Sequence, residues 1–158
     1  MSLAVFDIDG VVADVRHRLH HLDGRKSWRR FFAAAPDDPL LPAGADLVAD
    51  LARRHEIVWL TGRPGWLRPA TVDWLTGHGL PGTELHMRPD GDYRPARVFK
   101  LDVLRRLAPR DIAAVIDDDA EVVDAAMRAG FPAVLAGWVP RDPRDARLRD
   151  AQERQGRT

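Results

Sequence analysis

The sequence predicts an α/β fold, in which a central parallel sheet is covered by helices on both faces. Short apolar runs at residues 3–6, 57–61 and 112–116 have the length and composition of buried strands. Segments with the helical spacing of apolar residues lie between these runs. Buried strands that alternate with amphipathic helices form parallel sheets, so the expected architecture is a Rossmann-like three-layer sandwich.

The weaker patterns complete this sheet and add a small insert. The other expected elements are helices over 43–54, 67–78 and 98–107, a helix that ends at Gly130, and strands over 84–87 and 133–135. Residues 13–42 hold an aromatic cluster and a turn-rich stretch from Pro36 to Pro42. We expect this segment to form a small helical flap or cap insert on the sandwich.

Composition limits the classes of protein that the chain can represent. The 158 residues suit one domain, 45% of them are apolar, and 24 basic side chains balance 24 acidic ones. This balance gives no global field that would attract nucleic acid or an anionic membrane. No apolar run approaches the roughly 20 residues of a membrane helix, and the start of the chain has no basic leader region. We therefore expect a cytoplasmic protein with no membrane association and no obligatory protein partner.

The end of the chain differs in composition from the rest. Residues 141–158 are rich in arginine and contain little to bury except Leu148. We expect a domain over 1–140, with the flap at about 13–42, followed by a charged tail that is solvated or frayed. A nucleic-acid-binding arm is the alternative, but interleaved acidic residues reduce its net positive charge.

Polar side chains follow three of the predicted strands. Asp7 and Asp9 end the first strand, Thr61-Gly62-Arg63 ends the second, and Asp117-Asp118 ends the third. The carboxyl ends of parallel strands lie along one edge of a sheet, where open α/β sheets bind their ligands. Taken alone, Asp7 and Asp9, which Gly10 follows, could equally well cap a loop. The polar residues at the other two strand ends favour a binding site instead.

This many carboxylates in one crevice requires a cation. Close like charges raise each other's pKa unless a positive charge lies between them. Aspartate oxygens suit Mg²⁺, and no histidine or cysteine that would indicate zinc lies at these strand ends. We expect the Mg²⁺ ligands among Asp7, Asp9, Asp117 and Asp118.

These groups are the ones that phosphoryl transfer through an aspartyl-phosphate needs. Asp7 can act as the nucleophile, and Asp9 can protonate the leaving oxygen and then deprotonate the attacking water. The Thr61 hydroxyl, the Gly62 amide and the Lys100 ammonium can hold the phosphoryl oxygens.

The order of these motifs resembles the haloacid dehalogenase superfamily of phosphatases. The segments Leu60-Thr61-Gly62-Arg63, Arg88 to Arg94, Lys100 and Ile116-Asp117-Asp118 are more closely similar to the 3'-phosphatase domain of phage polynucleotide kinase and its stand-alone bacterial relatives. The resemblance covers about residues 3–137. It departs from the family pattern at Val11, where a threonine hydroxyl usually helps to fix the loop, and at Asp119, where a non-acid is common.

The resemblance implies a Mg²⁺-dependent phosphomonoesterase that acts on a phosphorylated nucleotide or nucleic-acid end, with a 3'-phosphate preferred. The small flap leaves the cleft open, which favours large substrates. Arg63, with Arg16 or Arg18 from the flap, is expected to bind phosphate oxygens. The main alternative is a 5'-nucleotide or other small-metabolite phosphatase of the same superfamily. A receiver-like phosphate-binding module is disfavoured because such modules lack an acid at the position of Asp9.

Several conspicuous residues have simpler interpretations. His17, His20 and His21 have the spacing of a metal site, but no acid is placed to complete it, so a role in the flap is favoured. The aromatic cluster of Trp28, Phe31 and Phe32 is more typical of a small flap core than of a base-stacking surface. Trp66 can either contact substrate or seat its helix. The loop residues Asp92 and Arg94 are expected to form a structural pair.

Overall fold

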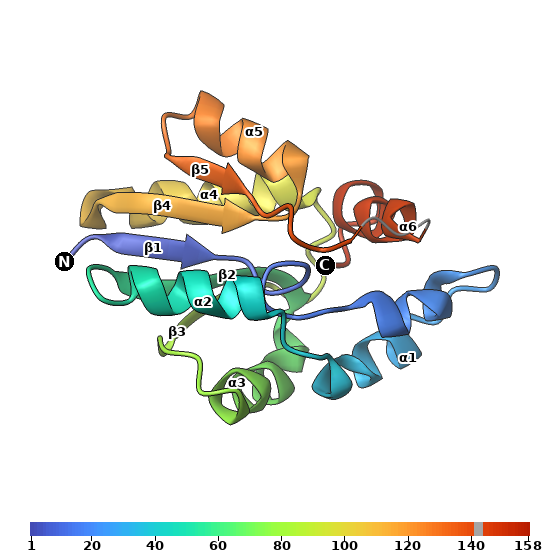
Figure 1. Cartoon of the computed structure of the whole chain (residues 1–158). Coiled ribbons are helices and arrows are strands. Elements are labelled where there is room, and N and C mark those ends of the chain that lie inside the picture. The colour runs from blue at the N-terminus through green and yellow to red at the C-terminus, as the bar shows by residue number, and fades with distance from the viewer. Residues whose placement is uncertain (141–143) are drawn as a thin grey trace.

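The computed structural model of the chain describes residues 1–140 and 144–158. Five parallel strands form one sheet in the order β3-β2-β1-β4-β5 (Figure 1). The strands are β1 (Leu3–Phe6), β2 (Glu56–Pro64), β3 (Glu84–Arg88), β4 (Ile112–Asp117) and β5 (Ala133–Leu135). A helix lies between every two consecutive strands of the chain, which confirms the predicted Rossmann-like three-layer fold.

Helices cover both faces of this sheet. They are α2 (Pro42–Leu51), α3 (Arg68–Gly77), α4 (Ala96–Leu107) and α5 (Ala120–Arg128). Because side chains alternate along a strand, Ala4 and Phe6 enter one hydrophobic cluster and Leu3 and Val5 enter the other. The first cluster includes side chains of α2 and α3, and the second includes side chains of α4 and α5.

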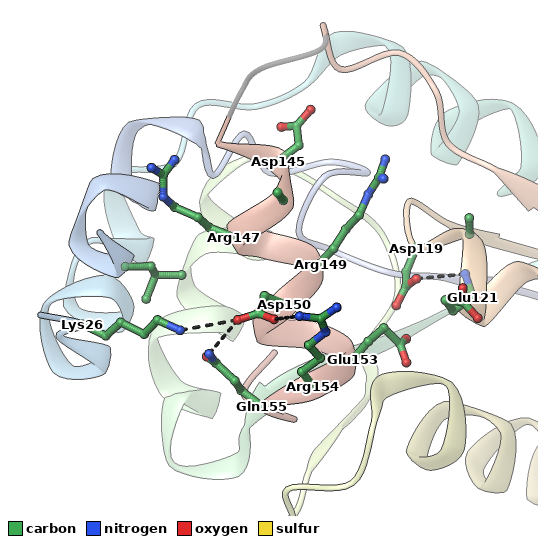
Figure 2. Close-up of a pocket in the computed structure, with 13 residues that line it drawn as sticks. Lys26, Asp119, Glu121, Asp145, Arg147, Arg149, Asp150, Glu153, Arg154 and Gln155 are labelled. Carbon is green, nitrogen blue, oxygen red and sulfur yellow. Dashed lines mark hydrogen bonds and ion pairs between the residues drawn. The ribbon is translucent and has the colours of Figure 1, made fainter. Parts of the chain in front are cut away.

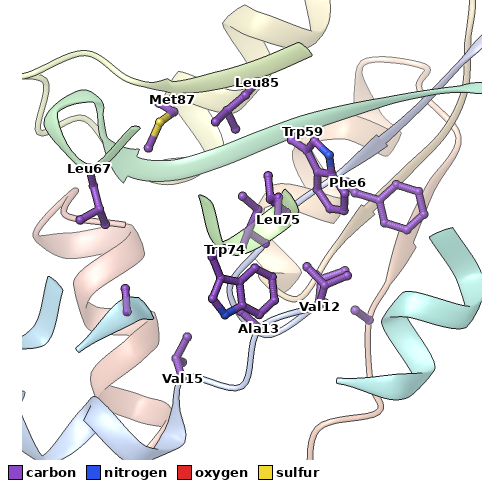
Figure 3. Close-up of a cluster of buried hydrophobic side chains, with 14 of the residues drawn as sticks. Phe6, Val12, Ala13, Val15, Trp59, Leu67, Trp74, Leu75, Leu85 and Met87 are labelled. Carbon is purple, nitrogen blue, oxygen red and sulfur yellow. The ribbon is translucent and has the colours of Figure 1, made fainter. Parts of the chain in front are cut away.

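The larger cluster contains the most bulky side chains of the core (Figure 3). Trp59 is fully buried beside Phe6, and its indole N–H donates to the Pro81 carbonyl at 3.0 Å. Trp74 of α3 is buried too, and its indole N–H donates to the Asp38 carbonyl at 2.9 Å. Each buried indole therefore has a hydrogen-bond partner, as burial of this ring requires.

The insert after β1 is a compact flap made of short helices. These are η1 (Arg16–Leu22), α1 (Trp28–Ala33) and η2 (Ala35–Asp37). Phe31 and Phe32 are buried and join the main core cluster, which confirms that this pair belongs to the core that holds the flap. Ser27 begins α1 by accepting a hydrogen bond from the Arg30 amide.

The expectation of a solvated or frayed tail is wrong for its described part, residues 144–158. This segment forms α6 (Asp145–Arg149) and a following π-helical turn, η5 (Asp150–Arg154). Leu148, Ala151, Gln152 and Thr158 are all buried. Ion pairs also join this segment to the flap, between Arg147 and Asp23 and between Lys26 and Asp150, and a composition count does not reveal such long-range partners. Residues 141–143 of the predicted tail lie outside the described residues.

None of the described helices has both the length and the apolar character required to span a membrane. The observed elements otherwise differ from the predicted ones only in their bounds. β2 extends three residues beyond the predicted end, and α2 ends three residues earlier than predicted.

Candidate active site

The site is built where β1 and β4 end side by side. The Asp7 amide donates to the Ile116 carbonyl at 2.9 Å, so the chain enters the site while it is still paired with β4. The chain then turns sharply, because the Ile8 carbonyl accepts from the amides of Val11, Val12 and Ala13 at 3.1, 3.0 and 3.0 Å. This turn follows directly on the strand and presents Asp7 and Asp9 at the sheet edge.

Gly10 is required at this turn for two reasons. Its φ of +77° lies in the left-handed region, and a Cβ atom there would lie 2.1 Å from the Asp118 Oδ2 atom. Val11, the departure from the family pattern, is fully buried, and its carbonyl accepts from the Trp138 indole at 2.9 Å. Packing and this hydrogen bond hold the loop without a threonine hydroxyl.

Three carboxylates form the acidic cluster of the site. Asp7, Asp117 and Asp118 each offer an oxygen within 4.8 Å of the other two. Burial, aided by Asp117 and Asp9, raises the pKa of Asp7 to about 7 despite the opposing effect of Lys100. Burial also raises the pKa values of Asp117 and Asp118. The cluster is therefore short of positive charge.

Lys100 from α4 supplies part of that charge. Its Nζ donates to Asp117 Oδ2 at 2.7 Å and lies 3.1 Å from Asp7 Oδ1. Burial alone would lower the pKa of Lys100, but Asp117 and Asp7 raise it, so the side chain stays an ammonium. One ammonium cannot neutralise three carboxylates. The all-oxygen cluster thus fits a hard divalent cation such as Mg²⁺, and the charge shortage is the observation that supports one.

Asp9 lies outside this cluster and is held by two arginines. Its Oδ1 accepts from Arg63 Nη2 at 2.6 Å, from Arg63 Nε at 3.0 Å and from Arg18 Nη2 at 3.1 Å. Burial would raise the pKa of Asp9, but Arg63 and Arg18 hold it well below its usual range. Its other oxygen, Oδ2, accepts from the Thr158 hydroxyl at 2.9 Å.

Two of the three arginines that were expected to bind phosphate, Arg63 and Arg18, are engaged in this network. The Arg63 guanidinium is 1% exposed and also donates to Asp38 and Thr71. The Arg18 guanidinium is fully buried, donates to Asp38 and to the Phe31 carbonyl, and lies over the Phe31 ring. These contacts favour a positioning role on Asp9, while direct phosphate binding by either arginine stays a prediction.

Asp38 is a central residue of the site that the sequence did not reveal. Its buried carboxylate accepts from Arg18 at 2.8 and 2.9 Å and from Arg63 at 3.1 Å. Asp38 also pairs with His17 Nε2 at 2.6 Å. One of the three flap histidines therefore does have an acidic partner, which the sequence did not reveal. Within the described residues, His20 and His21 pack ring against ring and do not join His17 in a metal site.

The second strand end provides the small groups next to the acids. The Thr61 hydroxyl is buried and accepts from the Arg63 amide at 3.2 Å. A Cβ atom on Gly62 would lie 2.2 Å from the backbone of Thr158, so the chain's last described residue touches this turn. Arg88 at the end of β3 supports it by donating to the Gly62 carbonyl at 2.9 Å and to the Arg94 carbonyl at 2.6 Å.

The remaining predicted residues lie at the margin of the site. Arg16 donates to Asp14 at 2.6 and 2.9 Å. Asp92 and Arg94 form the expected pair, at 2.8 Å. Asp119 is the N-cap of α5, and burial together with Glu153 raises its pKa to about 7.

The packed tail borders a large pocket, of about 1050 Å³, between the flap and α5 (Figure 2). Its walls include Lys26 of the flap, which pairs with Asp150, and Asp119 at the start of α5. Asp7 and Lys100 do not line this pocket, so it is distinct from the acidic cluster. The tail therefore forms part of the wall of this pocket.

Residues 2–135 match the family model described as the polynucleotide kinase PNKP phosphatase domain. No curated protein matches the chain. Among solved structures, a chain of the Pnkp1/Rnl/Hen1 complex is similar, with a TM-score of 0.70 and 23% identity over 85% of the present chain and 46% of its own length. The present chain therefore spans less than half of that relative.

Two other similar structures share the fold. One is the class C acid phosphatase from Bacillus anthracis with tungstate bound, with a TM-score of 0.61, 15% identity, and coverage of 94% of this chain and 78% of that one. The other is D,D-heptose 1.7-bisphosphate phosphatase from B. bronchiseptica, complexed with magnesium and phosphate. Its TM-score is 0.54 and its identity 22%, over 85% of this chain and 80% of its own.

Proposed function

Because the chain belongs to the family of polynucleotide kinase phosphatase domains and is a phosphatase of the haloacid dehalogenase superfamily, we propose that it is a Mg²⁺-dependent phosphomonoesterase of nucleotide or polynucleotide 3'-phosphates. The observation that carries the proposal is the meeting of Asp7, Lys100, Asp117 and Asp118 beside the Thr61-Gly62 turn. The substrate class rests on the family match and on the small flap.

Asp7 is the proposed nucleophile. Its carboxylate oxygen attacks phosphorus, the bond between phosphorus and the leaving oxygen breaks, and Asp9 gives that oxygen a proton. Water then attacks the aspartyl-phosphate and gives a proton to Asp9, which releases phosphate and restores both carboxyl groups. Because Arg63 and Arg18 lower the pKa of Asp9, this step requires Asp9 to gain a proton when substrate binds.

The other residues bind and orient the reacting groups. Lys100, the Thr61 hydroxyl and the Gly62 amide are the proposed partners of the phosphoryl oxygens. Arg18, Arg63 and the Asp38 carboxylate fix the position of Asp9. Asp7, Asp117 and Asp118 would hold Mg²⁺, which neutralises charge on the phosphoryl group when it is bound. The prediction that the Asp9 carboxylate is also a metal ligand is retained for testing, although its contacts are with arginines.

The test is phosphate release from a panel of 3'-nucleotides, a 3'-phosphorylated oligonucleotide, 5'-nucleotides and sugar phosphates. The wild type should have its highest kcat/KM on a 3'-phosphate. Asp7→Asn should reduce turnover at least a thousandfold while the protein stays folded. Asp73→Asn, which changes an exposed aspartate of α3, is the matched control and should match the wild type.

The panel also separates the alternative substrate classes. A tenfold preference for a 5'-nucleotide or a sugar phosphate over every 3'-phosphate would assign the site to small metabolites instead. Release of phosphate at more than a few per cent of the wild-type rate by Asp7→Asn would remove Asp7 from the role of nucleophile.

A further inference from the structure

Residues 156–158 contact several residues of the candidate active site. The Thr158 hydroxyl lies 2.9 Å from Asp9 Oδ2, the oxygen of Asp9 that the arginines leave for other partners. The Thr158 backbone rests on Gly62, and Arg88 donates to its carbonyl at 3.4 Å. A hydroxyl oxygen beside the proposed general acid is where the leaving oxygen of a phosphomonoester would lie.

The neighbouring residue occupies an aromatic gap. The Arg157 guanidinium lies 4.6 Å from the centre of the Tyr93 ring and 5.2 Å from the centre of the Trp28 ring. Trp28 comes from the flap and Tyr93 from the loop between β3 and α4, so the gap joins the two sides of the cleft. A planar cation between two rings shows that the gap admits a flat group.

The gap opens into a pocket with the size and lining of a ligand site. Its volume is about 310 Å³, and Phe32 and Trp66 also line it. The Trp66 side chain is 55% exposed and meets the Phe32 ring edge-on, so it does not serve to seat its own helix in the core. This volume is at the lower end of the range for small-molecule pockets.

The tail fits this position closely. Gly156 has a φ of +57°, and a Cβ atom there would lie 2.1 Å from the Tyr93 carbonyl oxygen. The Arg157 amide donates to the Ala151 carbonyl at 2.8 Å, which continues the packed turn of η5 into the cleft. The segment is therefore held by backbone contacts on both sides and does not rest on its ion pairs alone.

We propose that Trp28 and Tyr93 form the subsite for the planar ring of the substrate, a nucleobase, and that Arg157 and Thr158 occupy this subsite and the leaving-oxygen position until substrate displaces them. The inference rests on the proposed phosphatase function and adds the residues that select the leaving group. The spacing supports a nucleotide, because the group that packs on the rings and the hydroxyl beside Asp9 belong to adjacent residues.

A ratio of two rate constants tests the subsite. Occupancy by the tail lowers kcat/KM equally for every substrate, so it cancels in the ratio of kcat/KM for adenosine 3'-monophosphate to that for glycerol phosphate, which has no ring. Tyr93→Leu should lower this ratio about fivefold or more, the lower end of what a base–aromatic stack contributes. Tyr93→Phe, which keeps the ring, should restore it. An unchanged ratio in Tyr93→Leu would overturn the subsite.

A second pair of variants tests whether the tail competes with substrate for the subsite. Arg157→Ala should raise kcat/KM about threefold for both substrates and leave their ratio unchanged. Arg154→Ala is the matched control, because this tail arginine is exposed and pairs with Asp150, whereas Arg157 packs on Trp28 and Tyr93. Equal kinetics for Arg157→Ala and the wild type would show that the tail does not compete with substrate.

A binding measurement keeps this test separate from turnover. In the Asp7→Asn variant, saturating adenosine 3'-monophosphate should speed hydrogen exchange in residues 150–158, where the Gln155 and Arg157 amides donate to the Asp150 and Ala151 carbonyls. Nucleotide binding with unchanged exchange would overturn displacement. Absence of nucleotide binding to Asp7→Asn both with and without Arg157→Ala would overturn the subsite, whereas loss of phosphate release alone would count only against the proposed function.

Discussion

Replacing Asp38 by alanine should destabilise the protein strongly, although Asp38 lies in a turn and carries no proposed chemistry. Its carboxylate and that of Asp9 are the two acidic partners that the buried guanidinium groups of Arg18 and Arg63 share. Two positive and two negative charges balance in this cluster. Asp38→Ala leaves a net positive charge in a region from which water is excluded.

The structure sets the size of this effect. The pair between Arg63 Nη2 and Asp38 Oδ2 is separated by 3.1 Å, which corresponds to about 5 kcal/mol of attraction at an effective dielectric constant of about 20. Water that enters the space left by the side chain recovers part of this energy. Loss of one partner from a buried ion pair typically costs about 3–5 kcal/mol, and we expect Asp38→Ala to fall in this range.

Urea unfolding, followed by tryptophan fluorescence at pH 7, measures this cost. Asp37→Ala removes the same group from the neighbouring exposed position and should change the free energy of unfolding by less than about 0.5 kcal/mol. If Asp38→Ala is no less stable than Asp37→Ala, the buried arginines do not depend on Asp38. The reasoning that joins the flap to Asp9 through this cluster would then be wrong.

Three further predictions concern packing, pH and the metal. Gly44→Ala should destabilise the protein by about 1–3 kcal/mol in urea unfolding, because a Cβ there would lie 1.8 Å from a backbone carbonyl oxygen, whereas Gly77→Ala has open space and should be neutral or stabilising. Burial alone would raise the pKa of Glu84, but His86 and Arg110 lower it, so its ionised form stabilises the fold above the unfolded-state pKa of about 4.3. Glu84→Gln should lower the free energy of unfolding by less than about 1 kcal/mol, because this group is partly exposed. The difference from the wild type should shrink as the pH falls below the unfolded-state pKa. EDTA should abolish phosphate release, and added Mg²⁺ should restore it; full activity after exhaustive chelation would contradict the proposed metal requirement.

Sequence reasoning predicted the sheet and the acidic cluster because both follow local rules. An apolar run that ends in Asp7 and another that ends in Asp117 must meet if their strands are parallel neighbours. Lys100 was predicted because phosphoryl transfer needs a positive charge, but its position on a helix does not state which way its long side chain points. The structure places its ammonium between Asp7 and Asp117.

The residues that were missed have partners far away in the sequence. Asp38 is a single acid in a turn-rich stretch, and its partner Arg63 lies 25 positions further along the chain. Thr158 meets Asp9 across a separation of 149 residues. No periodicity relates such positions. Arg63 illustrates a different limit, because a guanidinium at a strand end reaches a phosphate or a neighbouring carboxylate equally well, and tertiary packing decides between them.

The central place of β1 also has a consequence for how the chain folds. β1 pairs with β2 on one side and with β4 on the other, so its four residues need partners from two distant parts of the chain. Closing these loops costs entropy before the pairing energy is gained, which makes folding slower than in proteins with local contacts. The acidic cluster assembles only when β1 pairs with β4, the strand that ends in Asp117. Substitutions that relieve the repulsion among these carboxylates should therefore affect the pairing of β1 with β4. Substitutions in β1 should affect both its pairing with β2 and its pairing with β4.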